Sequence, residues 1–235
     1  MKKLLIVLFS ASSISSSAQI SEKKQPSADE LSFIQATFQE ISRTDQIYRE
    51  QLSWGTLDEG VLAKIDSVLE NVGVQEGLIY VDELNLELSE TVQDSLWHLQ
   101  HTIDFRNHQY LRGIFERYGW IGEDVVEEEN YVQLLLLMHP PKGWDPRQYL
   151  EEYSEILHNE VLAGRMPAKT YAMFYDNIKG KILRETQLYG TNQQFDKETK
   201  KVLPPEIEDL DTSNEARQEI GLSPLKEGEY RIATK

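Results

Sequence analysis

The 235-residue chain has no cysteine. Disulfide bonds therefore contribute nothing to its stability, and a cysteine nucleophile is excluded. The chain also lacks a glycine-rich loop of the kind that holds phosphates, and no serine stands in a Gly-x-Ser-x-Gly setting. Stability must come from an apolar core, which an apolar content of 40% allows.

Long apolar runs are scarce. Residues 4–9 are apolar, follow Lys2 and Lys3, and precede the small residues 16–18. This pattern predicts a secretory signal peptide over residues 1–18, with Sec-type cleavage near Ala18. Later segments fall short of the roughly 20 apolar residues that a membrane-spanning helix needs. We therefore predict a periplasmic or secreted protein without a transmembrane segment.

Positive charge is also in short supply. The chain has 24 Lys and Arg against 40 Asp and Glu, a formal net charge of −16. Such a surface repels phosphate backbones, so we expect no nucleic-acid partner. The expected partner is a small polar ligand or another protein, and no cofactor is predicted.

Helical periodicity is what the chain has in abundance. Residues 131–138, YVQLLLLM, are apolar nearly all round, which is typical of a helix buried on most faces. Residues 77–85 fit either a brief strand or a helix, and residues 88–118 fit one bent helix or two. Apolar residues at three- and four-residue steps predict helices near residues 28–52, 61–73, 88–118, 131–138, 146–163, 167–183 and 213–220.

The predicted fold class is mainly α. We expect an irregular multi-helix bundle around the Leu-rich central helix, with an extended, turn-rich C-terminal segment. A polar leader over residues 19–28 would precede a single helical domain over residues 29–235. Residues 124–127 have the spacing of a capping box at a helix start.

Four residues have a spacing that suggests metal ligands. His98, His101, Asp104 and His108 follow one another at steps of three, three and four, so all could project from one helical face. The alternative is that His98, His101 and Asp104 form a solvated face, because periodic polar residues usually face water. We favour the solvated face and predict no metal.

His139 is the histidine at the end of the apolar helix, directly before two prolines. The negative end of a helix favours a protonated imidazole there. The side chain could act as a general acid or base, or it could cap the free carbonyl groups of the helix.

Several short motifs occur in a specific order: TDQIYR, LRGIFERYGW, YDN, QLYGT and PPEIEDLDTSNEARQEIGLSPL. Over about residues 45–230 the chain resembles the bacterial domain-of-unknown-function family 6624. The family implies no activity, but the resemblance selects His139, Asp176 and the Tyr-Gly-Thr segment among the candidates. The positions that match the family pattern are Asp45, Gln46, Arg49, Gly119, Trp120, His139, Asp176, Gln187, Tyr189, Gly190, Thr191, Arg217, Gly221 and Leu222.

Three functions remain open at this stage. The favoured one is an exported binding or interaction domain, in which buried polar residues also fix the C-terminal segment onto the helices. The second is a hydrolase-like enzyme with His139 as acid or base and Asp176 orienting it. The third is a helical metal protein. Residues expected to bind the polar ligand are Asp45, Gln46, Arg49, Trp120, Gln187, Tyr189, Thr191 and Arg217.

The segment Gln187 to Thr191 carries a further expectation. Gln187, Tyr189 and Thr191 alternate along the chain, so in an extended segment they would face one side. We expect that side to look toward His139.

Overall fold

The computed structural model describes residues 24–122 and 131–234. The predicted signal peptide and the capping box at 124–127 lie outside the described residues. In the described part of the chain no helix is both long and apolar enough to cross a membrane.

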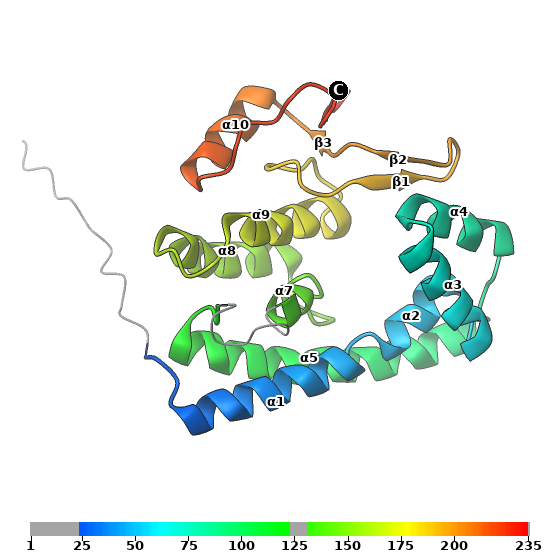
Figure 1. Cartoon of the computed structure of the whole chain (residues 1–235), viewed down its shortest axis with the longest axis horizontal. Helices are drawn as coiled ribbons and strands as arrows, with labels where there is room; N and C mark the ends of the chain where they lie inside the picture. Colours follow the sequence, from blue (N-terminus) through cyan, green and yellow to red (C-terminus); the bar gives the residue numbers. More distant parts are fainter. Residues whose placement is uncertain (1–23, 123–130, 235) are drawn as a thin grey trace, which may run out of the picture.

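The fold is mainly helical, as predicted, and its elements are stacked in layers (Figure 1). The long helix α5 (Glu90–Tyr118) lies at the base with α1 (Ala28–Thr44). The short helix α7 (Tyr131–Leu137) lies above them, followed by α8 (Pro146–Leu162) and α9 (Ala168–Asn177).

The Leu-rich helix α7 occupies the centre. It contacts α1, α5 and α9. Val132, Leu136 and Leu137 are fully buried, while Tyr131 at its start is exposed. Gln133 is also buried, and its amide exchanges hydrogen bonds with the N–H and the carbonyl of Ile121. The apolar sequence therefore packs on several neighbours at once, and one polar side chain satisfies the backbone that precedes the helix.

The single helix predicted over residues 28–52 is wrong. α1 ends at Thr44, and α2 (Ile47–Trp54) begins after a break at Asp45 and Gln46. The Gln100 amide donates to the Asp45 carbonyl oxygen at 2.8 Å. The Gln100 side chain of α5 thus bonds a carbonyl oxygen that, in a continuous helix, would accept a backbone N–H of the next turn. Insertion of a side chain into the backbone hydrogen bonds of a helix is a recognised cause of interruption.

Two ambiguities of the sequence are resolved as helix. Residues 88–118 form one helix, α5, and most of residues 77–85 lie in α4 (Val74–Leu84). α4 packs on α3 (Glu59–Asn71), and the two form one end of the molecule in Figure 1.

The helix predicted over residues 167–183 changes type partway. α9 passes into a π-helical turn, η2 (Ile178–Ile182), in which the Leu183 N–H donates to the Ile178 carbonyl at 2.9 Å. Gly180 lies in this turn, and a Cβ there would meet the Gln187 side chain at 3.4 Å. The wider turn and the small residue bring the C-terminal segment close to the helix.

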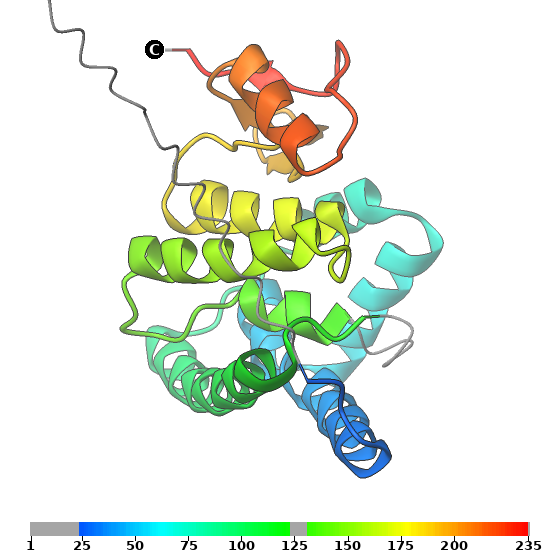
Figure 2. The ribbon, with the colours of Figure 1, turned by 90° about the vertical axis from the view of Figure 1, so that its left-hand side faces the viewer.

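The C-terminal segment is extended and turn-rich, as predicted, and lies over α8 and α9 (Figure 2). Strands β1 (Gln194–Asp196) and β2 (Lys201–Leu203) pair antiparallel, with Phe195 opposite Val202. Strands β3 (Glu206–Ile207) and β4 (Arg231–Ile232) pair in parallel. The last helix, α10 (Leu210–Glu219), begins before the predicted residue 213 because the Asp209 side chain caps it by accepting the Thr212 N–H.

Candidate functional site

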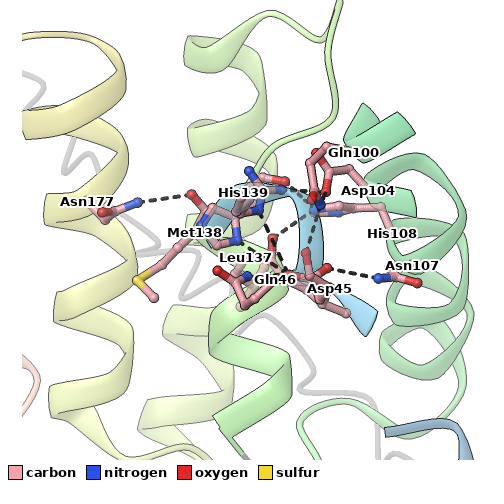
Figure 3. Close-up of polar contacts among 12 residues, drawn as sticks. Asp45, Gln46, Gln100, Asp104, Asn107, His108, Leu137, Met138, His139 and Asn177 are labelled. Atoms are coloured by element: carbon pink, nitrogen blue, oxygen red, sulfur yellow. Dashed lines mark hydrogen bonds and ion pairs between the residues drawn. The ribbon is translucent and has the colours of Figure 1, made fainter. Parts of the chain in front are cut away.

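A cluster of polar side chains is buried where the α1–α2 break, α5 and the end of α7 meet (Figure 3). We call it the Asp45 cluster. Its members are Asp45, Gln46, Arg49, Gln100, His101, Asp104, Asn107, His108 and His139.

Asp45 is its centre and is fully buried. One carboxylate oxygen accepts the Asn107 amide at 2.9 Å, and the other accepts the Gln46 amide at 2.6 Å. The Arg49 Nε atom lies 4.0 Å from that second oxygen, and the His139 Nδ1 atom lies 3.8 Å from it. The helix break places this carboxylate between two cationic or ionisable groups and two amides.

A second carboxylate lies beside the first. Asp104 is 3% exposed and accepts hydrogen bonds from the Arg49 guanidinium and, at 2.8 Å, from the Gln100 amide. The His101 Nδ1 atom is 3.8 Å from the other Asp104 oxygen. Arg49 therefore lies between two buried carboxylates and offsets part of their charge.

His108 fixes the chain around His139. Its Nε2 atom lies 2.8 Å from the Leu136 carbonyl oxygen and 2.9 Å from the His139 carbonyl oxygen. Carbonyl oxygens only accept, so Nε2 carries the proton and Nδ1 holds a lone pair. Cross-linking these two carbonyls to α5 sets the position of His139 at the end of α7.

Most polar atoms of the cluster are paired, but several are not. Among the described residues, six buried side-chain polar atoms have no hydrogen-bond partner in the protein, and all six belong to the Asp45 cluster. They are Arg49 Nε, Gln100 Oε1, His101 Nδ1, Asn107 Oδ1, His108 Nδ1 and His139 Nδ1. Buried polar groups are normally satisfied, so a concentration of exceptions in one place calls for an explanation, such as a bound water, ion or ligand or a functional role.

The cluster shifts the ionisation of its members. Burial alone would raise the pKa of Asp45, but His139, Asn107 and Arg49 outweigh burial and hold that pKa below its ordinary 3.8. Burial lowers the pKa of His108 below 6.5, and burial together with Lys142 lowers the pKa of His101. Asp45 is therefore expected to be charged and these two imidazoles neutral at neutral pH.

This ionisation predicts a loss of stability on acidification. Because the pKa of His108 is lower in the folded chain than in the unfolded chain, the unfolded chain takes up the proton first as pH falls below about 6.5. The free energy of unfolding should drop between about pH 7 and pH 5, by up to about 1.4 kcal/mol per pH unit for one such proton. Urea unfolding over that range measures it.

His108→Gln is the decisive variant. Its amide can donate to the same carbonyl oxygens but does not titrate, so the pH dependence should flatten. His158→Gln makes the same replacement at a part-exposed histidine of α8 outside the Asp45 cluster and serves as the matched control. Parallel curves for His108→Gln and wild type would show that His108 is not the titrating group.

A second polar centre lies on α9. Asp176 is fully buried. One oxygen accepts the Leu188 and Tyr189 N–H groups, both at 2.9 Å, and the other accepts the Thr191 N–H at 2.9 Å and its hydroxyl at 2.8 Å. Burial raises the pKa of Asp176, against the lowering effect of these four donors. The carboxylate thus fixes residues 188–191 onto the helix.

Neighbouring side chains complete this attachment. The Gln187 amide oxygen accepts the N–H groups of Thr191 and Asn192. Arg217 of α10 donates to the carbonyl oxygens of Tyr189 and Ser223, at 2.6 Å each. The polar side chains of this segment are used within the protein, in a network that attaches the C-terminal segment to α9.

The expected pairing of His139 with Asp176 is wrong. The carboxylate beside His139 is Asp45, and the hydrogen bonds to Asp176 come from residues 188–191. The segment 187–191 accordingly faces α9 rather than His139. The residues next to the two centres are in contact: the Asn177 amide donates to the Met138 carbonyl at 3.1 Å, as Figure 3 shows.

Trp120 also lies outside the Asp45 cluster. The residue is 5% exposed, its ring packs near Phe115, and its backbone N–H donates to the Glu160 carboxylate. A Cβ on Gly119, which has a φ of +75°, would meet the Glu160 carboxylate at 2.8 Å. The Gly-Trp pair therefore has a packing role in this structure.

The structure brings together Asp45, Gln46, Arg49 and His139 from the predicted ligand-binding and catalytic residues. The predicted solvated face is wrong for Asp104, which is buried, while His98 is exposed and His101 half-buried. No group of three or more His, Asp or Glu residues in the described ranges is arranged to hold a metal ion.

Sequence reasoning missed Gln100 and Asn107. A signal was present: Leu96, Gln100, Asp104, Asn107 and Leu111 follow one another at steps of four, four, three and four. The three polar residues therefore continue the apolar stripe of α5 and are buried with it. A polar residue at a position of the apolar stripe of a helix is therefore the sequence signal for a buried polar side chain.

Comparisons of the chain with family models, with curated proteins and with solved structures found no match. The function must therefore be argued from the geometry of the Asp45 cluster.

Proposed function

We propose that this protein is an exported domain that binds a small polar ligand at the Asp45 cluster. The observation that carries the proposal is that all six buried side-chain atoms of the described residues that lack a hydrogen-bond partner lie in this cluster. Three of them, on Arg49, His101 and His139, face a carboxylate oxygen at 3.8–4.0 Å, beyond hydrogen-bond distance. Gln100, Asn107 and the Nδ1 atom of His108 offer acceptors, and Arg49 offers a donor. A ligand with several hydroxyl, amide or amino groups would complete these bonds.

Access to the cluster supports binding. The carboxylates of Asp45 and Asp104 are 0% and 3% exposed, whereas the side chains of His139 and His101 are 25% and 26% exposed. The imidazoles therefore lie between the buried charges and the solvent. A ligand that reaches them would also feel the field of two carboxylates whose charge is only partly offset by Arg49.

Residues that carry the sequence resemblance also lie in the Asp45 cluster. Asp45, Gln46, Arg49 and His139 are four positions that match the pattern of domain-of-unknown-function family 6624, and the cluster contains all four. We propose membership of that family on this basis, and export on the basis of the apolar N-terminal pattern.

The second candidate function is acid–base catalysis by His139. Its partner would be Asp45 instead of the Asp176 that the sequence predicts. Asp45 faces the Nδ1 atom of His139 at 3.8 Å, so a carboxylate can orient the ring while Nε2 is left to exchange protons with a substrate. The 3.8 Å separation exceeds a hydrogen bond and would have to shorten in a complex.

A thermal-shift screen tests the binding proposal. Wild type, His139→Gln and the control His158→Gln would be heated with neutral sugars, amino acids, dicarboxylic acids and nucleosides. A ligand at about 100 times its Kd adds roughly 2.7 kcal/mol, which raises Tm by several degrees. One of these classes of ligand should raise the Tm of wild type and His158→Gln but not that of His139→Gln. Equal shifts in all three proteins across the screen would reject the proposal.

The same three proteins test catalysis. With 4-nitrophenyl esters and glycosides, removal of an acid–base group should lower turnover by roughly 10² to 10⁴. Equal turnover in wild type and His139→Gln would eliminate the enzymatic candidate while leaving the binding proposal to the thermal screen.

A further inference from the structure

Beside the Asp45 cluster lies an open hollow of about 760 Å³. One wall is a face of α5 between Asp94 and Phe105, and Lys142 contributes from the segment that follows α7. His101 belongs both to this hollow and to the Asp45 cluster. The hollow is therefore the approach to the cluster from the side of α5.

Three rings form a strip along this wall. Trp97, His101 and Phe105 follow one another at steps of four, which places them on one side of the helix. Trp97 and His101 stack with their centroids 5.3 Å apart and an interplanar angle of 19°. Trp97 is 39% exposed and Phe105 is 54% exposed. Aromatic faces this exposed within a hollow mark a place where an apolar face of a ligand can lie.

The polar lining narrows the class of ligand. Asp94, Thr102, His98 and Lys142 border the rings and offer both donors and acceptors of hydrogen bonds. Lys142 is the single Lys or Arg among the residues that line the hollow, and the chain as a whole carries a formal charge of −16. Phosphorylated and other strongly anionic ligands are therefore disfavoured. A neutral ring with an apolar face and a polar edge fits the lining.

We propose that the hollow binds a neutral oligosaccharide, two sugar rings of which stack separately, one on Trp97 and one on Phe105, because eight helical residues hold these two aromatic rings about 12 Å apart. The C–H face of one pyranose meets each aromatic ring, and the hydroxyl groups meet Asp94, Thr102 and Lys142. A neighbouring hydroxyl then reaches His101, whose Nδ1 atom lies 3.8 Å from the Asp104 carboxylate. This inference names the ligand class of the Asp45 cluster and so rests on the proposed function.

Calorimetric titration of the full chain with cellotriose, maltotriose and N,N′-diacetylchitobiose tests it, with adenosine as a non-saccharide ring. Trp97→Ala and Phe105→Ala should each weaken saccharide binding about tenfold or more. Phe33→Ala is the control, because Phe33 is an exposed ring on α1, 63% exposed, that does not line the hollow. The affinity of Phe33→Ala for the saccharides should equal that of wild type.

The other outcomes distinguish failure of the saccharide inference from failure of the proposed function. Equal affinity in the strip variants and wild type, tighter binding of adenosine, or no saccharide binding would overturn the saccharide inference. If the thermal screen then finds another class of ligand whose thermal shift depends on His139, ligand binding at the Asp45 cluster still stands although the saccharide inference has failed. Saccharide binding that depends on Trp97 and Phe105 but is unchanged in His139→Gln and Asp104→Asn would instead overturn the role of the Asp45 cluster and leave the hollow as the site.

Discussion

Asp45→Ala should lower the free energy of unfolding by about 3–5 kcal/mol, the cost of removing one partner from a buried ion pair. The carboxylate is fully buried and accepts the amides of Gln46 and Asn107, while Arg49 and His139 lie within about 4 Å. Its loss leaves these donors without an acceptor in a region that water enters poorly. Urea denaturation at neutral pH gives the free energy.

Asp66→Ala is the matched control for this change. Asp66 is an exposed aspartate on α3, so its removal should shift the unfolding midpoint little. Equal losses in the two variants would contradict the view that Asp45 holds the cluster together. Asp45→Asn should lie between wild type and alanine, because an amide keeps one acceptor oxygen but carries no charge.

Asp176→Ala should be at least as damaging, with a loss of about 3 kcal/mol or more. Three backbone N–H groups, those of Leu188, Tyr189 and Thr191, lose their acceptor, and each buried unpaired donor costs about 1–3 kcal/mol. The loss should be local as well as global. Hydrogen exchange at these three amides should accelerate more than exchange in α5.

Asp196 offers a close control for Asp176. It also accepts two backbone N–H groups, from Glu198 and Thr199, and the hydroxyl of Thr199, but it ends β1 directly before the exposed residues 197–199. Water can replace the carboxylate there, so Asp196→Ala should be much milder. If Asp176→Ala unfolds no more readily than Asp196→Ala, burial is not what makes the Asp176 network important.

Much of the fold could be predicted from periodicity. The helices with continuous apolar stripes, α5, α7 and α8, lie close to their predicted positions. The errors occur where a tertiary contact overrides the local pattern. Gln100 comes from 55 residues away to bond the Asp45 carbonyl at the break between α1 and α2, and no spacing within residues 28–52 records that contact. The π-helical turn at 178–182 likewise lies against Gln187, outside its own helix.

The site was predictable only in part. The sequence indicates His139 by its place at the end of the apolar helix and Asp45 by the motif resemblance, but nothing along the chain indicates that they approach each other across 94 residues. Asp176 was an equally reasonable partner, because a carboxylate on a neighbouring helix satisfies the same sequence argument. Pairing is decided by the packing of α7 between α1 and α9, which is a property of the whole fold.

The break at Asp45 has a consequence for folding. The hydrogen bonds it receives come from 55 and 62 residues away, and those of His108 reach 28 and 31 residues along the chain. Each of these bonds closes a long loop, whose entropic cost must be met before the bond contributes. The cluster can therefore form only after α2, α5 and α7 have docked, and no short fragment of the chain should contain the assembled cluster.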